Sequence, residues 1–200
     1  MMTPVNIDLF FTDSNAWWSG PIKWATDGLW SHTGIIFNMT DGSRELFEAV
    51  VHEGIVSNPV KRIRDIAKKP KTRVVVVQLD PATLHHNAEQ MMQAYLYARG
   101  SIGKVSYSTR QLAAMLLFES FGIPVKKSKN KVVCSEFVAR ALIAGKVLDP
   151  CSVRNPTPDS ISPDSLWRRF VDHQGNVQQY TGVHSKGMSF DNVALADRWM

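Results

Sequence analysis

The sequence predicts an α+β domain, with a twisted, mostly antiparallel sheet of about five or six strands and helices packed on it. Three stretches support this prediction. Residues 30–51 form two hydrophobic arms on either side of Asp41-Gly42, which is the pattern of a β-hairpin. Residues 73–79, R-V-V-V-V-Q-L, form an apolar β-branched run that is typical of a buried strand. Residues 131–142, K-V-V-C-S-E-F-V-A-R-A-L, begin with two valines and continue with apolar residues at helical spacing.

The other elements follow from hydrophobic periodicity and from the Gly and Pro residues at their ends. Gly100 and Gly122 each follow a helical pattern directly, as C-terminal capping residues do. In chain order we expect a strand at 5–12, a short helix ending at Gly28, the hairpin, a further strand across 51–61, a charged loop at 65–71, the strand at 73–79, helices at 83–99 and 109–121, the helix from Cys134 to about Gly145, and a short helix at 165–171.

The chain of 200 residues is long enough for one domain with a full hydrophobic core. We place that domain at residues 1–172. Residues 173–200 show no clear periodicity and form a C-terminal tail to which the sequence assigns no role. A composition of 44% hydrophobic and 20% charged residues is that of an ordinary globular protein.

The net charge of +5 suggests anionic surroundings, such as nucleic acid, cell-wall polymer or anionic lipid. The positive charge is concentrated in short runs at 61–64, 68–71 and 126–129, which we interpret as solvated loops. No aromatic residue interrupts these runs, so stacking on bases is not expected, and no nucleic-acid partner is predicted.

The cysteine content and the N-terminus bear on the compartment. Only Cys134 and Cys151 occur, and we expect both to be reduced. The N-terminal residues carry Asp8 and no basic region, so we expect no secretory signal and a cytoplasmic location as synthesised. The apolar runs fall short of the ~20 residues of a membrane span, and no transmembrane segment is expected.

Three residues suggest nucleophilic catalysis. Cys134 lies where a helix begins, beside free backbone N–H groups and the positive end of the helix dipole, which favours its thiolate. His32 begins the first arm of the hairpin, and Glu48 lies on the second arm. A cysteine at a helix N-terminus with a histidine and a carboxylate on neighbouring strands is the arrangement of cysteine hydrolases. A buried structural role is the alternative for Cys134.

Five short motifs occur in an order that resembles a known family. They are I-K-W-A-T at 22–26, S-H-T-G-I at 31–35, F-E-A-V at 47–50, C-S-E-F-V at 134–138 and T-P-D at 157–159. Together they resemble the circularly permuted branch of the NlpC/P60 papain-like superfamily, the YiiX/YebB-like hydrolases. The resemblance covers about the first four fifths of the chain and implies a circularly permuted papain-like fold.

The resemblance also implies an activity. Cys134 would be the nucleophile, His32 its base and Glu48 the residue that orients His32, with Tyr107 as a candidate near the site. The substrate would be an amide or an ester, in a cell-wall peptide or an acyl conjugate, cleaved through a thioester without a cofactor, and acyl transfer is the variant reaction. A non-catalytic module that binds lipid or peptidoglycan on the same fold is the alternative.

No metal site is predicted. His85 and His86 are adjacent in a helical pattern, so their side chains would point about 100° apart. No Cys/His cluster accompanies them in the sequence, and we interpret them as surface residues.

The hairpin register leaves the third catalytic residue open between Glu48 and His52. With a loop at 38–42, Glu48 would lie directly opposite His32, whereas with a loop at 41–43, His52 would lie there instead. In both registers Glu48 shares a sheet face with His32, so side-chain alternation does not decide. We favour Glu48, because a carboxylate stabilises an imidazolium better than a second imidazole does.

Overall fold

The computed structural model describes most of the chain. The described residues are 2–13, 19–26, 28–69, 72–79, 87–110, 112–113, 131–149, 161–172 and 180–184. The predicted helix at 109–121 and the T-P-D motif at 157–159 therefore lie wholly or largely outside them, as do His85, His86 and Cys151.

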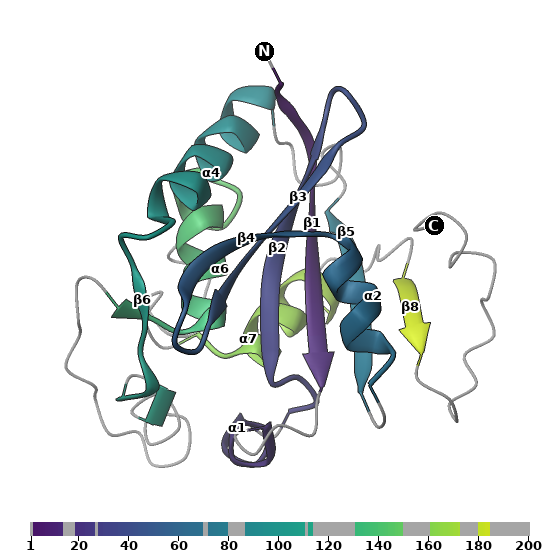
Figure 1. The fold of residues 1–200 in the computed structure, drawn as a ribbon, viewed down its shortest axis with the longest axis vertical. Helices are drawn as coiled ribbons and strands as arrows, with labels where there is room; N and C mark the ends of the chain where they lie inside the picture. Colours follow the sequence, from purple (N-terminus) through teal and green to yellow (C-terminus); the bar gives the residue numbers. More distant parts are fainter. Residues whose placement is uncertain are drawn as a thin grey trace.

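A single antiparallel sheet of six strands forms the centre of the described fold (Figure 1). Its spatial order is β4-β3-β2-β1-β5-β8, and a short parallel pair, β6-β7, forms a separate sheet next to β4. The strands are β1 (Pro4–Asp13), β2 (His32–Met39), β3 (Arg44–Val50), β4 (Gly54–Pro59), β5 (Arg73–Leu79), β6 (Ser106–Tyr107), β7 (Lys131–Val132) and β8 (Tyr180–His184). The predicted α+β class and mostly antiparallel sheet are thus confirmed.

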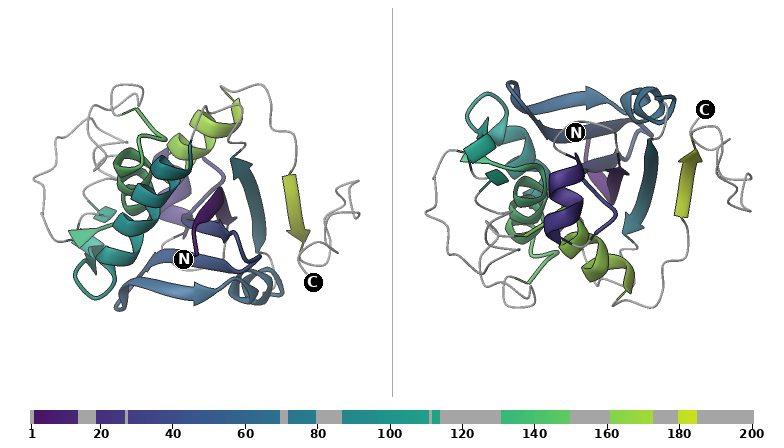
Figure 2. Two further views of the ribbon diagram at one scale, coloured as in Figure 1. Left: turned by 90° about the horizontal axis from the view of Figure 1, so that it is seen from above. Right: turned by 90° about the horizontal axis from the view of Figure 1, so that it is seen from below.

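Helices cover both faces of the sheet. They are α1 (Ser19–Thr26), α2 (Lys61–Ala67), α4 (Ala88–Ser101), α6 (Cys134–Ala144), α7 (Pro163–Trp167) and the π-helical turn η3 (Arg168–Asp172). Figure 2 shows α4, α6 and α7 gathered on one side of the sheet. The larger hydrophobic core lies between these helices and the sheet, whereas the core on the opposite face is smaller and includes Ile63 and Ala67 of α2.

Alternation along β1 assigns its residues to the two cores. Leu9 and Phe11 point into the larger core, and Phe10 points into the smaller one. Asp8 and Thr12 have the parity of Phe10 and are also buried. Since β1 has a neighbour on each side and a core on each face, it is the most enclosed strand, as its apolar sequence predicts.

Two expectations about local structure were wrong or incomplete. The basic run at 61–64 and the residues after it form helix α2 instead of a solvated loop. Part of the tail, β8, pairs with β5 at the edge of the sheet, from Arg73 opposite His184 to Val77 opposite Tyr180. The domain boundary at residue 172 stays a prediction.

Candidate active site

Cys134 is the first residue of α6, as the sequence predicts. The preceding Val133 has extended backbone, and its carbonyl accepts the N–H of Phe137 at 3.0 Å. Glu136 caps the same turn, because its carboxylate accepts the N–H of Val133 at 3.3 Å. Ion pairing with Arg140 at 2.5 Å balances the Glu136 charge. The thiol is buried, with 3% of the residue exposed, and it faces the positive end of α6.

His32 is the first residue of β2, and its imidazole is hydrogen-bonded to the Cys134 side chain. The ring packs edge-on against Phe10, with the ring centroids 5.6 Å apart. Gly34 makes room for this contact, since a Cβ at that position would lie 2.2 Å from Phe10 Cε1. The imidazole is 22% exposed, so solvent or a substrate can reach it.

Glu48, on β3, forms the second hydrogen bond to the His32 imidazole. Its Oε2 lies 3.0 Å from His32 Nε2. Its Oε1 accepts a hydrogen bond of 2.9 Å from Asn58 Nδ2 and is ion-paired with Arg62 of α2. Only 1% of the Glu48 side chain is exposed. Three donors therefore surround a fully buried carboxylate, which both fixes and stabilises its charge.

Both hairpin registers considered from the sequence are wrong. Glu48 pairs with Gly34, and Asn38 pairs with Arg44, so neither Glu48 nor His52 lies directly opposite His32. The loop consists of residues 40–42, closed by a 2.9 Å hydrogen bond from the Met39 N–H to the Ser43 carbonyl. Gly42 has a φ of +80°, as the last position of a three-residue hairpin loop requires.

His52 lines the same cavity as His32 but is not hydrogen-bonded to its imidazole. It is in the turn between β3 and β4, where its backbone is left-handed with a φ of 71°. Within the described part of the chain, no hydrogen bond or ion pair connects it with His32. The structure therefore brings Glu48, and not His52, to the His32 ring.

The contacts favour an ion pair between Cys134 and His32. Burial alone would lower the pKa of His32, but the charge of Cys134 and the hydrogen bonds to Cys134 and Glu48 raise that pKa from 6.5 to about 10. Burial likewise opposes ionisation of Cys134, yet the charge and hydrogen bond of His32, with the backbone N–H groups of Thr33 and Ser135, lower its pKa. These shifts favour the charged pair, with Cys134 as the thiolate and His32 as the imidazolium.

Glu48 stays ionised beside this pair. Burial would raise its pKa, but the hydrogen bond and charge of His32, the charge of Arg62 and the hydrogen bond of Asn58 lower it. A buried carboxylate that remains charged stabilises a protonated His32.

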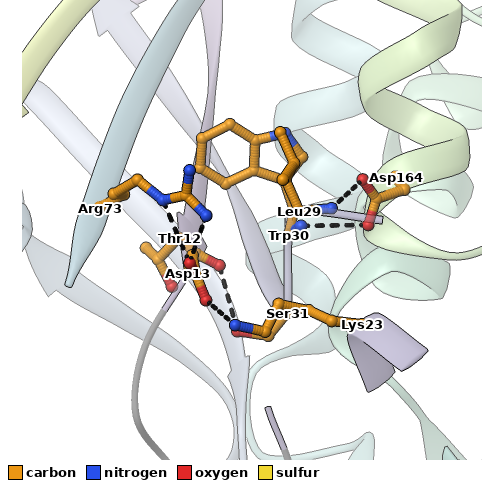
Figure 3. A network of polar contacts seen from close by, with 8 residues as sticks. All are labelled: Thr12, Asp13, Lys23, Leu29, Trp30, Ser31, Arg73 and Asp164. Atoms are coloured by element: carbon orange, nitrogen blue, oxygen red, sulfur yellow. Dashed lines mark hydrogen bonds and ion pairs between the residues drawn. The ribbon is translucent and has the colours of Figure 1, made fainter. Parts of the chain in front are cut away.

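The segment that leads into His32 is anchored from the far end of the sequence (Figure 3). The Asp164 carboxylate of α7 accepts the backbone N–H of Leu29 at 2.8 Å and that of Trp30 at 3.1 Å. Gly28 lies so close to this carboxylate that a Cβ would be 1.9 Å from it. Ser31 then donates its N–H to the Thr12 carbonyl at 2.9 Å, which begins the pairing of β2 with β1.

Tyr107 lies near the thiol. The β6-β7 pair aligns Tyr107 with Val132, two residues before Cys134. Burial and the nearby charge of Cys134 raise the pKa of the phenol, so it stays protonated and able to donate a hydrogen bond. The structure therefore places this sequence candidate beside the site.

A cavity of about 690 Å³ lies beside the imidazole. His32, Glu48 and Tyr107 form part of its wall, and the rest comes from β3, β4, the turn between them, α2 and Lys69 after it, with Thr12 and Ser31 at one side. The cavity gives a substrate access to the side of His32 that carries Glu48.

Asn58, Arg62 and Asp164 belong to the site but were missed from the sequence. Arg62 stands within a basic run that reads as solvated surface, and Asn58 is an ordinary polar residue at a strand end. Ser162-Pro163-Asp164 is the pattern of a helix start, and the Ser162 hydroxyl does accept the Ser165 N–H at 3.1 Å. That pattern could have indicated that Asp164 lies in an ordered helix start. It could not have identified the backbone N–H groups of Leu29 and Trp30 as its partners.

The described residues contain no group of three or more His, Cys, Asp and Glu side chains placed to hold a metal ion. Among the helices that the structure describes, none has the length and hydropathy needed to cross a membrane.

Comparison with known proteins supports the fold. No protein-family model matches the chain, and no curated protein matches it. The structure is similar to the crystal structure of the metalloprotein YiiX from Escherichia coli O157:H7, with a TM-score of 0.54 and 19% sequence identity. The match covers 93% of this chain and 99% of that protein. The similarity is consistent with the YiiX-like branch suggested by the motifs and, at this identity, it establishes the fold alone.

Proposed function

We propose that this protein is a cysteine hydrolase that cleaves an amide bond through a thioester intermediate. One observation carries the proposal: the Cys134 thiol, at the start of α6, is hydrogen-bonded to His32, whose Nε2 lies 3.0 Å from the Glu48 carboxylate. These groups have the roles of nucleophile, base and orienting acid in that order. The motif resemblance to permuted NlpC/P60 hydrolases and the YiiX-like fold support it further.

These contacts support the following reaction sequence. The Cys134 thiolate attacks the carbonyl carbon, and the His32 imidazolium gives its proton to the leaving nitrogen as the C–N bond breaks. Neutral His32 then takes a proton from water as that water attacks the thioester, and the C–S bond breaks to release a carboxylic acid. The thiolate and the imidazolium are restored together. If another nucleophile replaces water, the same intermediate gives acyl transfer.

The start of α6 also provides for the developing oxyanion. The N–H of Cys134 belongs to the first turn, where backbone donors lack acceptors within the helix. It would lie next to the carbonyl oxygen of a substrate attacked by its own side chain. The phenol of Tyr107 is a second donor near the thiol. These donors would stabilise the negative oxygen without rearrangement.

Hydrolysis of a panel of substrates tests the proposal. The panel contains peptidoglycan fragments, N-acyl amides and acyl esters, with the wild type compared with Cys134→Ala and His32→Ala. We expect release of acid by the wild type alone, and a mass increase equal to the acyl group on Cys134 when the reaction is stopped by acid. Equal product from Cys134→Ala would contradict the proposal.

Alkylation separates a hydrolase from a binding module that has lost turnover. A Cys151→Ser variant leaves Cys134 as the sole thiol, because the chain has only two cysteines. We expect iodoacetamide to modify it rapidly at pH 6–7, where an ordinary thiol is almost fully protonated. His32→Ala in the same background should remove this reactivity. Slow modification that His32→Ala leaves unchanged would favour the binding module.

A further inference from the structure

The cavity beside His32 has a cationic wall formed by α2 and by the residues that follow it. Arg62, Asp65 and Ile66 of α2 line it at spacings of three and four residues, which is one face of the helix, and Lys69 lines it just after the helix ends. Lys61, the first residue of α2, lines it as well. One side of the cavity thus carries three basic side chains and a single acidic one.

These charges differ in whether a protein group already balances them. Arg62 is ion-paired with Glu48, and Asp65 with Lys68 at 3.7 Å. Lys61 and Lys69 are exposed and form no ion pair with any carboxylate in the described parts of the chain. The unbalanced charge in the cavity is therefore positive, and it lies on residues that contact water.

Arg62 connects this wall to the reactive groups. It lines the cavity and contacts the Glu48 carboxylate, which in turn contacts His32. A molecule in the cavity would thus lie against His32 at one side and against α2 at the other. Apolar side chains such as Val50 and Ile66 complete the wall, so an uncharged portion of a ligand can pack there too.

We propose that the α2 side of the cavity binds an anionic group of the substrate, a carboxylate or a phosphate, through Lys61 and Lys69. This inference rests on the proposed function and narrows it, since the substrate becomes an amide or ester that carries a negative charge near the bond to be cleaved. Lysine is suited to such a group as a mobile point charge that needs no fixed geometry. Neutral acyl conjugates would then be poor substrates.

Ligand binding to the full chain with Cys134→Ala tests the proposal without catalysis. The probes are N-acetylglycine, its neutral counterpart N-acetylglycinamide, and inorganic phosphate, each titrated by NMR or calorimetry. We expect the carboxylate or the phosphate to bind more tightly than the neutral amide, and which of the two does so identifies the anion. Adding Lys61→Gln and Lys69→Gln should weaken anion binding by roughly threefold to tenfold and leave the amide unchanged.

Controls make a negative result informative. Lys146→Gln removes an exposed lysine at the end of α6, outside the cavity, and should leave anion binding unchanged. Circular dichroism checks that each variant is folded, and the single Lys61 and Lys69 variants replace the double variant if it is not. Affinity for the neutral amide that equals or exceeds the affinity for both anions, or anion binding that the lysine variants leave intact, would overturn the proposal.

A second measurement tests whether Lys61 and Lys69 affect the reaction of Cys134 with an anionic reagent. In the Cys151→Ser background, iodoacetate carries a carboxylate and iodoacetamide does not, so the ratio of their alkylation rates reports the charge near Cys134. We expect Lys61→Gln with Lys69→Gln to lower this ratio and to leave the iodoacetamide rate unchanged. Slow reaction with both reagents would instead count against the proposed hydrolase, while the binding titrations would still decide the anion site.

Discussion

Glu48 Oε2 lies 3.0 Å from His32 Nε2, although the strand partner of Glu48 is Gly34, two residues beyond His32. The contact is therefore diagonal across the β2-β3 ladder. Diagonal neighbours are about 7–8 Å apart at Cα, a gap that a glutamate and an imidazole can bridge. An acid on this strand does not have to be directly opposite the histidine, so the register is less decisive than strict pairing suggests.

The first prediction compares Glu48 with His52. Glu48→Ala should lower kcat/KM by roughly 100-fold or more, because the imidazolium loses its buried counter-charge and its orientation. His52→Ala should remain within about twofold of the wild type, since His52 forms no hydrogen bond or ion pair with His32 in the described structure. Steady-state kinetics on a cleaved substrate measure both. The reverse pattern would assign the third role to His52.

The second prediction concerns Arg62. Its charge lowers the pKa of Glu48, so Arg62→Met should let that pKa rise. Glu48 would then become protonated at a higher pH, and the acid limb of the kcat/KM profile should move to higher pH. Arg62→Lys keeps the charge and should largely restore the wild-type limb.

Lys146→Met is the control for Arg62, because it removes an exposed positive charge that does not line the cavity. It should leave the profile in place. An acid limb that stays fixed in Arg62→Met would mean that Arg62 acts only by holding α2 against the sheet.

The helix that bears Cys134 was predictable from sequence because its signals are local. Apolar residues at helical spacing follow two valines, and Gly145 ends the pattern, so the expected bounds agree with Cys134–Ala144. The strand at Arg73–Leu79 was predictable for the same reason, as an uninterrupted β-branched run. Each depends on neighbours within a few residues.

The hairpin register was not predictable, because every register considered keeps Glu48 on the same face as His32. The turn sets a third register through the left-handed Gly42 and the Asp41 side chain, whose Oδ1 accepts the Ser43 N–H at 3.0 Å. Sequence patterns place Asp41-Gly42 in the turn but leave its loop length open.

The role of Arg62 was hidden for a different reason. Helix α2 is short and buries only Ile63 and Ala67, so its apolar pattern is weak and its charges dominate the sequence. The contact between Arg62 and Glu48 arises only when α2 packs against the sheet, where Ile63 and Ala67 join the smaller core. A contact of that kind depends on the tertiary arrangement and leaves no local signal.

The third prediction concerns Asp164. Asp164→Asn replaces one acceptor oxygen by an NH₂ group that faces a backbone N–H, so one of the two bonds to Leu29 and Trp30 is lost. The free energy of unfolding should fall by about 1–3 kcal/mol. Iodoacetamide labelling of Cys134 should also slow, because the segment before His32 loosens. Urea denaturation and labelling measure the two effects.

Glu53→Gln is the matched control for Asp164, since it changes an exposed carboxylate in the turn after β3. It should alter neither stability nor labelling. A stable Asp164→Asn variant with normal labelling would show that the carboxylate does not position His32.

The last prediction concerns Asp8, a buried carboxylate of β1 whose Oδ2 accepts a 3.0 Å hydrogen bond from Asn38. Burial raises its pKa from 3.8 to about 6, against the hydrogen bond of Asn38 and the charge of Arg44. The folded state therefore favours the protonated form of Asp8 more than the unfolded state does. The cost of ionising it is absent below pH 4, develops between pH 4 and 6, and is complete above pH 6.

Asp8→Asn should thus exceed the wild type in free energy of unfolding by about 2–3 kcal/mol at pH 7 and by little at pH 4. Urea denaturation at both values measures the difference, and a difference that does not change with pH would show that Asp8 keeps its ordinary pKa in the folded protein.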